Sequence, residues 1–96
     1  MINTEKLSNH PEDLEFMWPS PFNHEQAHVF LHRNALNQPP TGYLSAPHTT
    51  GATPQKIKIR IVRDDNEVPE GSQYLGSYSD SYMGPAFHAL HVFLLP

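Results

Sequence analysis

The clearest pattern of hydrophobic and polar positions in the chain is the run from Lys56 to Ile61, where cationic and apolar residues alternate strictly. Alternation with a period of two places successive side chains on opposite faces of a β-strand. The three isoleucines of this run therefore face a core, and the three cations face solvent. We predict a half-buried strand over residues 56–63, in which Lys and Arg keep an exposed edge from pairing with neighbouring molecules.

Two later segments also have the pattern of strands. After two clusters of turn-forming residues, residues 73–78 can return antiparallel to the strand at 56–63. The segment 87–95 is apolar on both faces, which is typical of a central strand that is covered on each side. The C-terminal half of the chain therefore predicts a small antiparallel sheet.

The first helix signal lies between residues 9 and 18. Pro11 occupies a suitable first helical position, and Glu12 and Asp13 would place negative charge in the first turn. Pro19 would end the helix. These features predict a short helical segment over residues 9–18.

A second helical segment is predicted from Asn23, which can cap a helix N-terminus, to about Asn37. A strand over residues 27–33 is the alternative, because β-branched and aromatic residues occur there. The sequence His-Val-Phe-Leu is found both here, at 28–31, and in the predicted terminal strand, at 91–94. The local pattern leaves helix and strand open at this point.

Residues 38–55 are rich in Pro, Thr, Gly and Ser and have only Tyr43 and Leu44 as an apolar anchor, so we predict a long loop. The length of 96 residues fits one domain, residues 1–96, in which ten prolines favour short elements. The pattern does not decide whether residues 1–8 are ordered. The predicted fold class is α+β, with two short N-terminal helical segments packed on a small antiparallel sheet of three to four strands.

Composition and charge exclude several classes of protein. The chain has no cysteine, which removes disulfides, thiolate zinc sites and thiol nucleophiles. It has no secretory signal pattern, and its longest apolar run is too short to span a bilayer, so we expect a cytoplasmic protein without a membrane partner. The formal net charge of −4 disfavours nucleic acid as a partner.

One motif names a reaction by itself. Residues 24–28 spell H-E-x-x-H, and these positions resemble the active-site helix of the zincin metalloproteases. On a helix, His24 and His28 would share a face and could bind one Zn²⁺, with Glu25 as the general base. The third ligand would come from His88 or His91 on the predicted terminal strand. The seven histidines of the chain also make an accidental match easier.

Two surfaces have the composition of binding sites. A cationic row lies on the solvent face of the strand predicted at 56–63 and could bind phosphate or an acidic partner; it consists of Lys56, Lys58 and Arg60. Three tyrosines with even spacing would project to one side of an extended segment that is rich in Gly, Ser and Asp: Tyr74, Tyr78 and Tyr82. Tyrosine among small polar residues is typical of recognition surfaces.

Together these features predict a small, non-enzymatic binding or interaction protein that acts as a homodimer and needs no cofactor. It would contact a protein partner or a second copy through the tyrosine segment, the cationic row or the 38–55 loop. The first alternative is a zinc site on the histidine motif with hydrolase activity. The weaker alternative is the binding of an anionic ligand on the cationic row.

Overall fold

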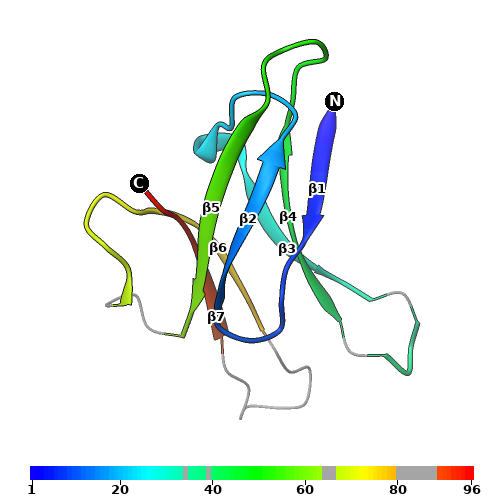
Figure 1. Cartoon of the computed structure of the whole chain (residues 1–96). Helices are drawn as coiled ribbons and strands as arrows, with labels where there is room; N and C mark the ends of the chain where they lie inside the picture. The colour runs from blue at the N-terminus through cyan, green and yellow to red at the C-terminus, as the bar shows by residue number, and fades with distance from the viewer. Residues whose placement is uncertain (34, 39, 64–66, 80–88) are drawn as a thin grey trace.

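The computed structural model describes residues 1–33, 35–38, 40–63, 67–79 and 89–96. These residues form seven strands in two antiparallel sheets and a single 3₁₀ turn, η1 (His24–Gln26) (Figure 1). The strands are β1 (Ile2–Lys6), β2 (Glu12–Trp18), β3 (His28–His32), β4 (Thr41–Pro47), β5 (Gln55–Val62), β6 (Gln73–Ser79) and β7 (Ala89–Leu94). Sheet A has the strand order β1-β4-β3, and sheet B has the order β2-β5-β7-β6. Within the described residues, no helix has the length and apolar character that crossing a membrane requires.

The predicted α+β class is wrong, because both N-terminal segments that were expected to be helical are mainly extended. Residues 12–18 form β2, where inward Leu14, Phe16 and Trp18 alternate with outward, exposed residues. An isolated helix of this length would be marginal in water. The strand instead pairs along its whole length with β5, from Glu12 opposite Ile61 to Trp18 opposite Gln55.

The second expected helix is also absent. Among the described residues of this segment, 24–26 form the 3₁₀ turn η1, and the strand alternative for 27–33 is confirmed by β3 over His28–His32. The predicted loop at 38–55 is wrong over Thr41–Pro47, which forms β4 at the centre of sheet A. Its apolar face consists mainly of small side chains, so the local sequence gives a weak strand signal. Gly42, Leu44 and Ala46 face the core in alternation with partly exposed residues.

The three C-terminal segments are confirmed as strands over the residues that the structure describes, which leave out 87 and 88, although their arrangement in the sheet differs from the one predicted. The strand predicted at 56–63 is central rather than at an edge, since β5 lies between β2 and β7. The strand predicted at 73–78 pairs with β7 and not with β5. The terminal strand is central, as expected, and is flanked by β5 and β6.

The two sheets face each other across one apolar core, so the chain is a β-sandwich. Sheet A contributes Leu44, whereas sheet B contributes Trp18, Ile59, Leu90 and Val92; each of these side chains is 0% exposed. The strand β3 of sheet A also contacts β6 of sheet B, which closes one side of the sandwich. The two strands approach each other closely at Gly76, where an added Cβ atom would lie only 2.9 Å from Cβ of Val29. The opposite side of the sandwich has β1 and β2 as its two edges (Figure 1).

Candidate functional site

The histidine motif is divided between a turn and a strand. Asn23 caps η1, because its side-chain oxygen accepts a hydrogen bond of 3.0 Å from the backbone N–H of Glu25. His24 lies in η1, whereas His28 is the first residue of β3 and is exposed. The geometry with two imidazoles one helical turn apart, which the zincin signature requires, is therefore not formed.

The structure also separates His91 from the motif. His91 lies on β7 and projects from the outer face of sheet B, where its ring centroid is 6.2 Å from that of Tyr74. His28 projects from the outer face of sheet A, on the other side of the core. His88 lies outside the described residues. Among the residues that are described, no three His, Asp or Glu side chains form a group that could hold a metal ion.

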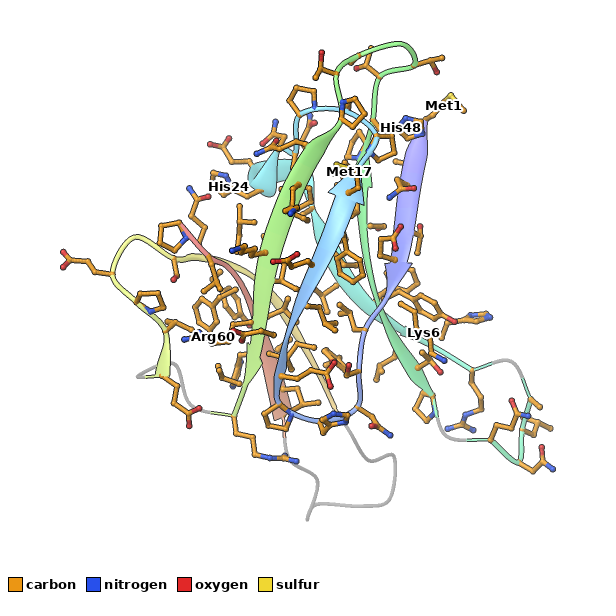
Figure 2. All side chains as sticks on the ribbon, in the orientation of Figure 1. Met1, Lys6, Met17, His24, His48 and Arg60 are labelled. Carbon is orange, nitrogen blue, oxygen red and sulfur yellow. The ribbon has the colours of Figure 1, made fainter. Side chains whose placement is uncertain are left out.

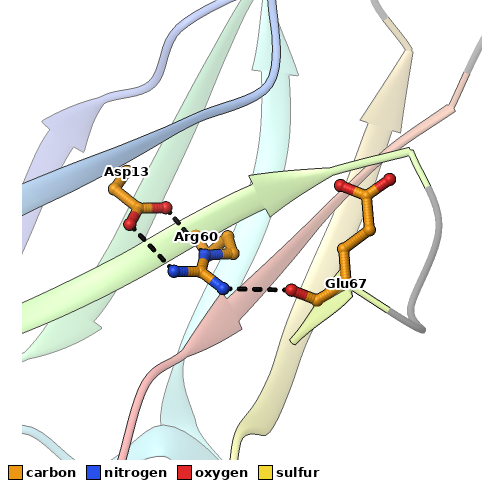
Figure 3. Close-up of polar contacts among 3 residues, drawn as sticks. All are labelled: Asp13, Arg60 and Glu67. Carbon is orange, nitrogen blue, oxygen red and sulfur yellow. Dashed lines mark hydrogen bonds and ion pairs between the residues drawn. The ribbon is translucent and has the colours of Figure 1, made fainter. Parts of the chain in front are cut away.

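The cationic row of β5 lies opposite carboxylates of the same chain. Arg60 binds Asp13 of β2 through two hydrogen bonds, of 2.8 Å from Nε and 3.1 Å from Nη2, and its Nη1 donates to the carbonyl oxygen of Glu67 at 3.0 Å (Figure 3). Lys58 and Lys56 lie 3.6 and 3.9 Å from the carboxylate oxygens of Glu15. The acidic part of β2 therefore neutralises much of this row.

The Asp13–Arg60 pair affects the ionisation of both side chains. The hydrogen bond from Arg60, assisted by its positive charge, lowers the pKa of the Asp13 carboxyl, while partial burial acts in the opposite direction. The hydrogen bond to Asp13 raises the pKa of Arg60. Because Asp13 has a lower pKa in the folded chain than in the unfolded chain, the pair stabilises the fold above the unfolded pKa of about 3.9. This contribution is lost as the pH falls through the folded pKa.

We therefore expect Asp13→Asn to lower the melting temperature at neutral pH by at most a few degrees, since the Asp13 side chain is 56% exposed. The difference from the parent protein should disappear as the pH is lowered through the folded pKa of Asp13. Thermal unfolding followed by circular dichroism over this pH range measures both effects. Glu15→Gln is the matched control and should have a smaller effect, because its ion pairs are longer. Equal melting temperatures for the parent and Asp13→Asn at neutral pH would contradict this expectation.

The predicted tyrosine row does not share one face. A register shift between Tyr74 and Gly76 turns the following residues over, so that Tyr74 projects outward and is 54% exposed, whereas Tyr78 is buried. The hydroxyl of Tyr78 donates to the carbonyl oxygen of Ser8. Tyr82 lies outside the described residues. Residues at even spacing project to one face only when the strand is regular. The bulge between Tyr74 and Gly76 interrupts the strand, so Tyr74 and Tyr78 project to opposite faces.

The outer face of sheet A presents a different set of side chains, which we call the platform: Thr4, Phe30, His32 and Tyr43. Phe30 and Tyr43 are opposite each other on β3 and β4, with ring centroids 5.6 Å apart and an interplanar angle of 24°. The ring of His32 lies edge-on to Tyr43 at 6.4 Å. These four residues surround a shallow depression of about 220 Å³. Phe30 is 40% exposed, so the platform is accessible from solvent.

The charge around the platform is positive or neutral. Lys6 lies at the end of β1 (Figure 2), opposite Tyr43. On β3, His28 and His32 flank Phe30. All residues of the three strands are described, and none of the carboxylates projects from this outer face, since Glu5 alternates to the other side of β1. The face therefore contrasts with sheet B, where carboxylates lie between the cations.

Sequence reasoning identified only parts of this site. The sequence predicts His28 as a possible metal ligand and Tyr43 as the apolar anchor of a loop. A strand at residues 41–47, which would place Tyr43 beside the segment of His28, is indicated by one pattern in the sequence. Thr41, Tyr43 and Ser45 alternate there with inward Gly42, Leu44 and Ala46. The pattern is weak because glycine and alanine contribute little hydrophobic contrast.

Comparisons with protein-family models, with curated proteins and with solved structures give no match for this chain. Fold and site together define the class as a small antiparallel β-sandwich with an exposed aromatic face on its three-stranded sheet.

Proposed function

We propose that the chain is a non-enzymatic binding protein, and that the platform contacts an acidic protein segment with apolar or aromatic side chains. The observation that carries this proposal is the stacked Phe30–Tyr43 pair, in which Phe30 is exposed, on a face where the three strands place no carboxylate. Aromatic side chains are enriched in the cores of protein interfaces because they bury a large area with few rotatable bonds. Lys6 at the border of the platform favours a partner of negative charge.

The shallowness of the platform favours an extended partner over a small molecule. Small-molecule sites are concave and enclose most of their ligand. A depression of about 220 Å³ bordered by Thr4, Phe30, His32 and Tyr43 can accept one side chain, while the flat surface around it can contact the neighbouring residues of a chain. A protein segment can place one side chain in the depression and lay its neighbouring residues on the flat surface. A long polyanion such as nucleic acid is disfavoured by the net charge of −4.

The test is an NMR titration with a short synthetic peptide in which glutamate and phenylalanine alternate. We expect chemical-shift changes at Thr4, Phe30 and Tyr43, and no comparable changes with the peptide that has lysine in place of glutamate. Phe30→Ala and Tyr43→Ala should each weaken binding by roughly 5- to 30-fold, as for the truncation of an aromatic side chain at the centre of an interface. Tyr74→Ala is the matched control, because Tyr74 is 54% exposed on the opposite outer face.

Two results would overturn the proposal. One is equal binding of the glutamate and lysine peptides, which would remove the electrostatic part. The other is binding that Tyr74→Ala weakens as much as Phe30→Ala does, since the contact would then not lie on the platform. If a single-stranded oligonucleotide bound the same residues and the acidic peptide did not, the partner would be a nucleic acid and not a protein segment.

A further inference from the structure

The four edge strands of the sandwich differ in how well they are protected from pairing with a strand of another molecule. The edges β3 and β6 contact each other. The edge β2 contains three carboxylates in seven residues, and like charges disfavour its pairing with another copy. Within the part of the chain that the structure describes, β1 has β4 as its only hydrogen-bonded strand, and its five residues contain neither proline nor a bulge. Exposed edges of this kind are templates for pairing with a further strand.

The register of β1 shows which backbone groups remain for such a partner. The backbone N–H of His48 donates to the carbonyl of Met1, and that of Leu7 donates to the carbonyl of Gly42. In an antiparallel ladder, hydrogen-bonded and non-hydrogen-bonded positions alternate. The odd-numbered residues of β1 therefore bond to β4, and the N–H and C=O groups of the even-numbered residues point to the open edge: those of Ile2, Thr4 and Lys6.

We infer that β1 pairs antiparallel with β1 of a second copy about a two-fold axis at Thr4. In this register Thr4 lies opposite Thr4 of the partner subunit, and Ile2 lies opposite the partner's Lys6. Each of these pairs exchanges two backbone hydrogen bonds, and all the groups that point to the open edge find a partner. The pairing extends sheet A continuously from one copy into the other.

The side chains of β1 favour this register over its neighbours. Asn3 is placed opposite the partner's Glu5, so that an amide faces a carboxylate at both ends of the strand pair. A shift of the axis to Glu5 would set two carboxylates directly opposite each other, which is destabilising. A shift to Asn3 would place Lys6 and its outward backbone groups beyond the residues of the partner's β1. The axis at Thr4 is the register that pairs all five residues of β1 without opposing like charges.

The dimer would place both platforms on one side of a continuous sheet. An axis perpendicular to the sheet keeps the outer faces of the two copies on the same side. The two β4 strands would be separated by three strand spacings, or about 14 Å. Such a surface would bind two segments of one partner, although the strand pairing does not depend on the proposed function of the platform.

The test is the dissociation constant of the full chain, measured by analytical ultracentrifugation over a range of concentrations. Asn3→Glu sets carboxylates opposite each other at both ends and should weaken the dimer roughly tenfold, whereas Asn3→Lys should tighten it by a similar factor. Thr4→Pro removes an N–H that points to the partner and should give a monomer. Gln73→Glu is the matched control, because it adds the same charge to sheet B.

Circular dichroism distinguishes loss of pairing from loss of the fold. The N–H of Thr4 is not bonded to β4, and proline is tolerated on the outer side of an edge strand, so the variant should keep the strand content of the parent. A parent chain that is monomeric at every accessible concentration would overturn the inference. So would a dimer whose dissociation constant is the same in Asn3→Glu and Asn3→Lys. Peptide binding to the platform is measured separately, so its failure leaves this result unaffected.

Discussion

Replacing Trp18 with alanine is expected to lower the free energy of unfolding by about 3–5 kcal/mol. Trp18 is 0% exposed and ends β2, where its ring packs edge-on against Phe22 with centroids 4.9 Å apart. Its removal leaves a large cavity between the two sheets. A domain of this size has a total stability on the order of 5–15 kcal/mol, so the loss is a substantial part of the whole.

Urea unfolding followed by circular dichroism would measure this change. Met17→Ala is the matched control, because Met17 is the adjacent residue of the same strand but is 60% exposed on the outer face. We expect the control to change the stability by less than about 1 kcal/mol. Equal effects of the two substitutions would mean that β2 does not bury alternate residues, and would contradict the assignment of this segment as a strand.

Gly42→Ala is expected to be the second large destabilisation, by about 1–3 kcal/mol. A Cβ atom at this position would lie 2.5 Å from Cε2 and 2.6 Å from Cδ2 of Tyr78. The ring cannot move away easily, because Tyr78 is buried and its hydroxyl is bonded to the carbonyl of Ser8. Glycine is therefore required at Gly42 by the close approach of β4 to an aromatic ring.

A double-mutant cycle would isolate this contact. Tyr78→Ala removes the ring and is itself destabilising, but it also removes the atoms that a methyl group at Gly42 would meet. In the Tyr78→Ala background, Gly42→Ala should then cost much less than in the parent chain. Additive effects, measured by urea unfolding, would show that the penalty arises from another source.

The strands with a strong alternation could be predicted because their pattern is local. Residues 56–61 alternate between isoleucine and cations, and each isoleucine of this run is buried. The terminal strand was recognised as central because both of its faces are apolar. The segment of β2 also has an alternation, of Leu14, Phe16 and Trp18, but Pro11 and the carboxylates after it match the start of a helix equally well. In the fold, pairing along β5 outweighs this local preference.

The candidate site could not be predicted as a unit. The platform joins residues from β1, β3 and β4, which are far apart in the sequence and are brought together by the register of sheet A. The motif at residues 24–28 was the strongest local signal for chemistry, yet its function depends on a helix that the chain does not form. The cationic row was visible in the sequence, but its neutralisation by β2 was not.

The sequence by itself determined the strands over residues 56–62, 73–78 and 89–94 and the faces of the first of these, since a period of two is a property of neighbouring residues. Only the tertiary structure decided which strands pair, which way Tyr74 and Tyr78 project and which charges of β2 and β5 lie opposite each other. Asp13 and Arg60 are 47 positions apart, and a bulge near Gly76 reverses the face of every residue that follows it. Contacts between distant segments depend on pairing and register, and no local pattern fixes either one.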